Sequence, residues 1–76
     1  MHPVHRAILD RLVDGDGPPP TRRELAEIAG LSLSGLSYHY RALVRAGWIV
    51  HEPLLARTTR ITDAGRMALA AAERQE

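Results

Sequence analysis

The chain has 76 residues, a formal net charge of +1 and no cysteine. A chain of this length has room for one small domain but not for a separate catalytic lobe, and it buries only about 60% of its unfolded surface. It can form neither disulfides nor thiolate zinc sites, and because it shows no apolar run of membrane-spanning length and no signal peptide, we expect a cytoplasmic protein.

The first predicted helix covers residues 4–14 and is scaffold. Val4, Ile8 and Leu12 recur at four-residue spacing, which places them on one apolar stripe of a helix. The glycines and prolines between residues 14 and 20 stop this helix, because proline lacks the backbone N–H that a continuing helix needs.

The second predicted helix, residues 21–29, has signals at both ends. Thr21 can accept from backbone N–H groups of the first turn, and Glu24 can reach back to the Thr21 N–H, which is the capping-box arrangement. Gly30 is predicted to end the helix, because a positive φ at that position costs glycine nothing sterically. The predicted apolar face consists of Leu25, Ile28 and Ala29.

The third predicted helix, residues 33–46 with Ser32 as N-cap, has two contrasting faces. At about 100° per residue, its apolar face consists of Leu36, Tyr40, Leu43 and Gly47, flanked by Leu33 and Val44. The opposite face consists of Ser34, Ser37, Tyr38, Arg41 and Arg45. From residue 28 to residue 51 there is no Asp or Glu, whereas a surface helix normally mixes both signs of charge.

Such an acid-free face suits a DNA groove. Arginines neutralise phosphates, and hydroxyl groups on short side chains can bond to bases or phosphates at close range. The net charge is small, but residues 28–62 contain four Arg and a single acidic residue, so the positive excess lies where the contact is predicted. An ordinary solvated helix is the alternative interpretation of this face.

After the third helix the hydrophobic period changes to two, which predicts a β-hairpin over residues 48–61. Its expected tip carries Leu54-Leu55, which either folds back onto Trp48 or forms part of a protein contact. The last predicted helix, residues 63–74, has Thr62 as its cap and an alanine-rich apolar face. That face either covers the first helix or makes a dimer contact.

Short motifs in the chain are similar to those of known DNA-binding families. Residues 30–39, GLSLSGLSYH, and 43–49, LVRAGWI, resemble the GLSxSxxSxHxxxLxxAGxI pattern of winged helix-turn-helix regulators of the MarR and ArsR type. Residues 19–27, PPTRRELAE, resemble the opening of the LexA-type repressor DNA-binding domain. Residues 61–66, ITDAGR, are similar to the segment that ends the wing in MarR-like proteins.

The resemblance implies one winged helix-turn-helix domain over residues 1–76, mainly α with a small β-hairpin: a three-helix core, a two-stranded wing and a C-terminal helix. It also implies sequence-specific binding of double-stranded DNA by a small transcriptional regulator, a repressor, with helix 33–46 in the major groove. In such folds terminal helices often form the dimer, so helix 63–74 is the candidate for a homodimer contact, and a two-fold dimer would bind half-sites about one helical turn apart.

In such folds the wing also reaches the neighbouring DNA backbone or minor groove, where we expect Arg57 first and Arg60 second. Leu33 could touch a thymine methyl group. The predicted DNA-binding residues are Thr21, Arg22, Ser34, Ser37, Tyr38, Arg41, Arg45, Arg57 and Arg60.

Other functions were weighed against DNA binding. The competing class is a protein-interaction module on the same scaffold, with Leu54-Leu55 and the alanine-rich helix as the contact. No Ser-His-Asp, phosphate-loop or HExxH pattern is present, so we expect no enzyme. No two of the four histidines share a helical face at i, i+4 spacing, so we expect no metal site and no cofactor, and His39 is expected to be half-buried and hydrogen-bonded.

Overall fold

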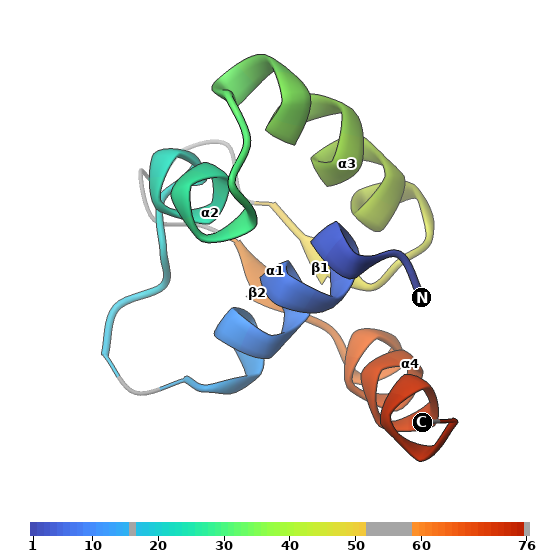
Figure 1. The fold of residues 1–76 in the computed structure, drawn as a ribbon. Helices are drawn as coiled ribbons and strands as arrows, with labels where there is room; N and C mark the ends of the chain where they lie inside the picture. The colour runs from blue at the N-terminus through green and yellow to red at the C-terminus, as the bar shows by residue number, and fades with distance from the viewer. Residues whose placement is uncertain (16, 52–58, 76) are drawn as a thin grey trace.

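The computed structural model describes residues 1–15, 17–51 and 59–75. Within them the elements are α1 (Pro3–Val13), α2 (Arg22–Ala29), α3 (Leu33–Arg45), β1 (Ile49–Val50), β2 (Arg60–Ile61) and α4 (Asp63–Arg74) (Figure 1). The expected fold class, mainly α with a small antiparallel hairpin, is confirmed. Each helix begins and ends within one residue of its expected bounds.

Side-chain caps fix the helix boundaries around the helix-turn-helix pair. The Thr21 hydroxyl accepts from the Glu24 N–H at 3.1 Å, and the Ser32 hydroxyl accepts from the Gly35 N–H at the same distance. Gly30 ends α2 with φ 70°, in the left-handed region that favours glycine. The turn between α2 and α3 is therefore set by local sequence.

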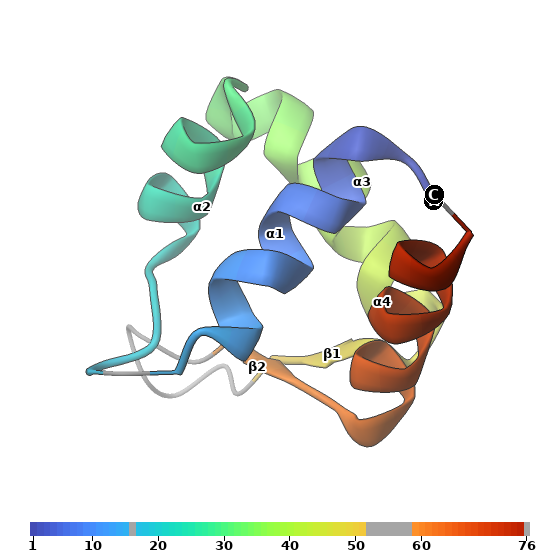
Figure 2. The ribbon, with the colours of Figure 1, turned by 60° about the horizontal axis from the view of Figure 1, so that its bottom comes forward.

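The core lies where α1 meets the other helices. Its buried hydrophobic side chains come from all four helices and from β1: Ile8, Leu9, Leu12, Leu25, Ala26, Leu36, Tyr40, Leu43, Ile49 and Leu69. Figure 2 shows α1 in the middle, with α2 on one side of it, α4 on the other and α3 behind it. This placement leaves one long face of α3 free of contacts with α1.

Two expectations about apolar faces were wrong. Ile28 is 44% exposed, because α2 meets α1 through the arc between Leu25 and Ala26 and Ile28 lies on the far side of Leu25. Gly47 does not continue the apolar face of α3, since the helix ends at Arg45 and Gly47 turns the chain with φ 79°.

The hairpin and the start of α4 are joined at one place. Ile49 pairs with Ile61 and Val50 with Arg60, and Ile49 points into the core. The Thr62 hydroxyl donates to the Gly47 carbonyl at 2.6 Å, while the Thr62 N–H donates to the Trp48 carbonyl at 3.0 Å. The expected positions of Leu54-Leu55 and Arg57 lie outside the described residues. Among the described helices, none has the length and apolar character to cross a membrane.

Candidate nucleic-acid interface

The solvent face of α3 carries the predicted hydroxyl and guanidinium groups together. Tyr38 is 76% exposed, and Ser34, Arg41 and Arg45 are exposed as well. These four and the half-buried Ser37 line one open hollow of about 390 Å³. The Ser37 hydroxyl donates to the Leu33 carbonyl at 3.0 Å, so its proton is used within the helix and its oxygen is left as an acceptor.

Two further hollows continue this surface. One, of about 380 Å³, lies where the start of α2 meets α3 and is lined by Thr21, Arg22, Arg23, Leu33, Leu36 and Ser37. The other, of about 580 Å³, lies between α3 and the hairpin base and is lined by Arg22, Tyr40, Arg41, Val44, Arg45 and His51. The three hollows share lining residues, so they form one continuous surface around α3.

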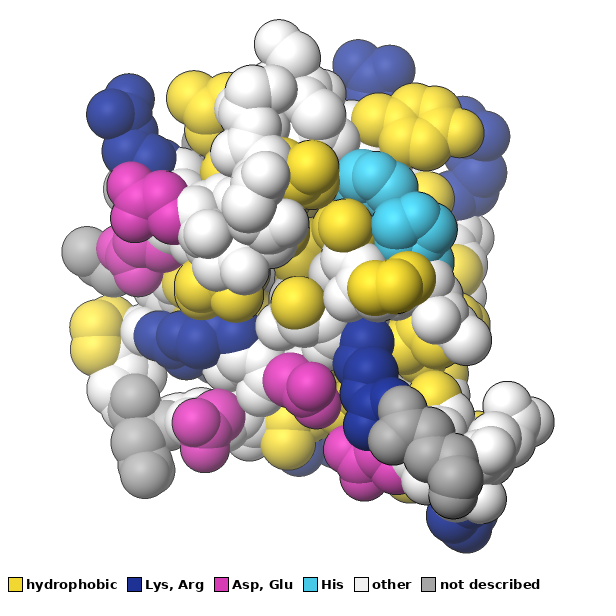
Figure 3. All heavy atoms as spheres, viewed as in Figure 1, with side chains coloured by type: hydrophobic (Ala, Val, Ile, Leu, Met, Phe, Trp, Pro, Cys, Tyr) yellow, Lys and Arg dark blue, Asp and Glu magenta, His cyan; other side chains and the backbone are white. Residues whose placement is uncertain are grey.

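The electrostatics of this surface are one-sided. No Asp or Glu is among the described residues that line the three hollows. In Figure 3 acidic side chains lie over α2 and over the lower part of the molecule, whereas the upper right, over α3, carries Arg and His and no acid. Within the described part of the chain, neither Arg41 nor Arg45 has an ion-pair partner. No acidic side chain in the described ranges therefore neutralises these two charges.

The start of α2 adds a guanidinium group with a defined orientation to the surface around α3. Arg22 places its Cζ atom 4.4 Å from the centroid of the Tyr40 ring, a cation–π contact between α2 and α3. The side-chain oxygen of the neighbouring Thr21 accepts the hydrogen bond that caps the helix, so Thr21 can bond a phosphate by donating its hydroxyl proton. A phosphate contact for Arg22 was predicted from the sequence, but its contact with Tyr40 was not.

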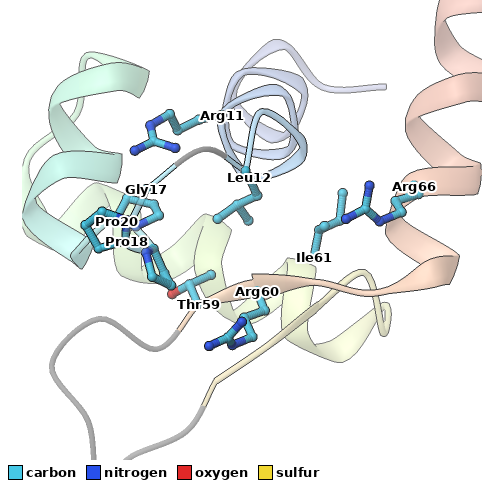
Figure 4. Close-up of a pocket in the computed structure, with 11 residues that line it drawn as sticks. Arg11, Leu12, Gly17, Pro18, Pro20, Thr59, Arg60, Ile61 and Arg66 are labelled. Carbon is cyan, nitrogen blue, oxygen red and sulfur yellow. The ribbon is translucent and has the colours of Figure 1, made fainter.

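Arg60 is apart from the α3 surface. It is exposed on β2 and lines a separate cavity of about 390 Å³ between α1, the loop before α2, β2 and α4. Figure 4 shows Arg60, Arg11 and Arg66 reaching the rim of that cavity from three elements, with Leu12 and Ile61 between them. The structure thus groups seven of the nine predicted residues around α3, with Thr21 at the edge of that surface. Arg60 lies away from it, and Arg57 is outside the described residues.

The Tyr40 hydroxyl makes hydrogen bonds that the sequence did not predict. It lies 2.6 Å from the Thr59 hydroxyl and 2.9 Å from His51 Nδ1, and Thr59 is itself buried. His51 follows β1 and Thr59 precedes β2, so both strands of the hairpin are bonded to α3 at the same end. Tyr40 had been assigned only to the apolar face, because its spacing carries no information on partners far along the chain.

Three histidines also come together. The rings of His2, His5 and His39 have centroids 4.8 to 5.1 Å apart, and His5 Nε2 lies 3.1 Å from His39 Nδ1. The expectation that His39 is half-buried and hydrogen-bonded is confirmed. Burial lowers the pKa of His5, and the nearby charges of His39, His2 and the N-terminus lower it further. In the part of the chain that the structure describes, no three His, Cys, Asp or Glu side chains are arranged to hold a metal ion.

Comparison with known proteins gives two matches. A family model described as a helix-turn-helix domain matches residues 1–52. The chain is also 36% identical over 62 residues to the LexA repressor of Anaeromyxobacter dehalogenans, an alignment that covers 80% of this chain and 27% of that protein. The matched region therefore corresponds to about a quarter of the length of that relative.

Proposed function

We propose that this chain, which belongs to the helix-turn-helix domain family, places α3 in the major groove of double-stranded DNA and acts as a transcriptional repressor. The observation that supports this most directly is the continuous surface around α3, which presents Arg22, Arg41 and Arg45 and, among its described lining residues, no acidic one. Similarity to a LexA repressor agrees with this proposal.

The dimensions of α3 suit the groove. Its 13 residues span about 20 Å at 1.5 Å per residue, and a helix with side chains is about 10–12 Å wide, close to the major-groove width of about 12 Å. Ser34 and Tyr38, exposed on the first two turns, would lie nearest the base edges. Arg41 has the reach and the planar fork to bond a guanine or a phosphate.

Groups on either side of α3 would hold the DNA backbone. Arg22 and Thr21 lie at the start of α2, where backbone N–H groups also favour phosphate oxygens. Arg45 lies in the last turn of α3, at the hollow beside the hairpin. Arg57 and Arg60 are proposed as the contacts of the wing itself.

The exposed face of α4, opposite the side that packs on α1, supports the proposal of a two-fold dimer. Leu69 packs into the core beside α1, whereas Met67 is 71% exposed and Ala64 and Ala70 are exposed near it. Small side chains permit close approach of a second helix, so a copy of the same chain would fit there. Such a dimer would bind half-sites about one helical turn apart.

The test is selection of bound duplexes from random DNA, followed by affinity measurements over a range of salt concentrations. Each phosphate contact makes the slope of log affinity against log salt more negative by about 0.9, so contacts by three arginines predict a slope of about −2.7 per chain. Arg6→Gln is the matched control, because Arg6 lies on α1 beside Asp10 and lines none of the three hollows around α3. A slope near zero would contradict DNA binding and favour an apolar contact with a protein.

A further inference from the structure

Tyr40 joins α3 to both other parts of the proposed interface. Its side chain is 2% exposed. Its ring carries the Arg22 guanidinium on one face, and its hydroxyl bonds both Thr59 and His51. A buried tyrosine hydroxyl needs a hydrogen-bond partner in any core, but filling the core would require neither the contact with Arg22 nor partners on both strands of the hairpin.

We propose that Tyr40 is a positioning residue for the contact with the DNA backbone, acting through Arg22 and through the two strands of the hairpin. This inference rests on the proposed function. Tyr40 itself would not touch DNA, because it is buried beneath the surface that would.

The ring of Tyr40 restricts a side chain that would otherwise move freely. Arg22 is the first residue of α2 and is exposed, and an exposed arginine samples many rotamers. Stacking at 4.4 Å holds its guanidinium in the hollow that Arg41 and Arg45 also line. Three cations from two helices then face one hollow before any ligand arrives, which lowers the entropy lost on binding.

The hydroxyl of Tyr40, on α3, holds the hairpin through hydrogen bonds that do not belong to the strand pairing. The described strands pair through only two residues each, and a two-stranded hairpin is marginally stable on its own. One O–H donor and two lone pairs let the Tyr40 hydroxyl bond Thr59 and His51 at once. Because these residues flank the strands on the same side, the bonds set the position of the hairpin relative to α3.

Substitutions can separate the two roles of Tyr40. Tyr40→Phe keeps the ring under Arg22 and removes both hydrogen bonds, whereas Tyr40→Leu removes the ring as well. Arg22→Gln, made in each background, reports whether the ring positions the guanidinium. Ile8→Val is the stability control, because Ile8 is fully buried in α1 and its truncation weakens the core without touching this network.

In the wild-type background, Arg22→Gln should make the slope of log affinity against log salt less negative by about 0.9. Over a fourfold rise in salt concentration, this variant should therefore lose about 3.5-fold less affinity than the wild-type chain does. It should do the same in Tyr40→Phe, but change affinity less than about twofold in Tyr40→Leu, where the guanidinium is no longer held. Tyr40→Phe should weaken DNA binding several-fold more than Ile8→Val does, when the two variants have the same thermal stability.

Two results would overturn the inference while leaving the proposed function intact. One is a Tyr40→Phe variant that binds like Ile8→Val with the wild-type salt slope. The other is an Arg22→Gln effect of equal size in the Tyr40→Leu and wild-type backgrounds. If Tyr40→Leu does not fold, the nearly isosteric Tyr40→Phe still decides the role of the hydroxyl. A wild-type chain that binds no duplex overturns the proposed function, and this inference with it.

Discussion

Gly65 is the position where one added methyl group should do most damage. It lies in the first turn of α4 and is buried against the hairpin. A Cβ at this position would lie far inside the contact distance of the Trp48 carbonyl oxygen and 2.8 Å from Ile61 Cγ1. The Trp48 oxygen cannot retreat easily, because it accepts the Thr62 N–H at 3.0 Å. In Gly65→Ala, α4 must therefore move away from the hairpin.

The magnitude follows from two opposed effects. Overpacking costs about 1–3 kcal/mol, and a backbone partner that cannot rotate away places this site at the upper end of that range. Replacing glycine by alanine in a helix returns about 1 kcal/mol. We expect a net loss of about 2 kcal/mol, which for a chain of this size lowers Tm by about 8–16 °C.

Thermal and urea unfolding followed by circular dichroism measure this loss. Gly35→Ala is the matched control: Gly35 is also helical, but the nearest atom to its added Cβ is Ser32 Oγ at 3.5 Å, an ordinary contact. That variant should gain up to about 1 kcal/mol. If Gly65→Ala proves as stable as Gly35→Ala, α4 does not sit against Trp48 and Ile61 as described.

Three further outcomes are expected. Arg41→Glu should abolish duplex binding in fluorescence anisotropy yet change the free energy of unfolding by less than about 0.5 kcal/mol, and a collapse in stability would show that Arg41 is not exposed. Thr62→Val should cost about 1–2 kcal/mol in urea unfolding, because the hydroxyl both caps α4 and bonds the Gly47 carbonyl. Because the pKa of His5 is lower in the folded chain than in the unfolded one, its neutral form stabilises the fold above the ordinary histidine pKa of about 6.5, and this contribution is lost as pH falls through the lowered value. Unfolding free energies measured from pH 7.5 to pH 5 should fall, less steeply in His5→Gln, and equal slopes would contradict the assignment.

The parts of the fold that could be predicted are those decided within a few residues. Thr21, Ser32 and Thr62 cap their helices through atoms three residues away, and Gly30 ends α2 through its own φ. Such features depend on local geometry that any chain with these residues would adopt. The acid-free face of α3 is of the same kind, since it follows from helical periodicity and composition alone.

The features that escaped prediction all depend on how helices pack. His5 and His39 are 34 positions apart, and Tyr40 and Thr59 are 19 apart, so no spacing rule connects them. Ile28 shows the same limit on a smaller scale. Periodicity gave the width of the apolar face of α2, but the rotation of the helix against α1 decided which edge of that face was left in water.

The small net charge of the chain does not weigh against DNA binding, because salt screens distant charges and only those near the contact act on the DNA. At physiological salt the Debye length is about 8 Å. The molecule extends at least 22 Å along each principal axis, so an acidic group on the side opposite α3 lies well beyond that distance. What a phosphate meets is the nearby set of Arg22, Arg41 and Arg45, and none of the described residues that line their hollow is acidic. Acidic groups on the opposite side of the molecule therefore lower the net charge toward +1 with little effect on that field.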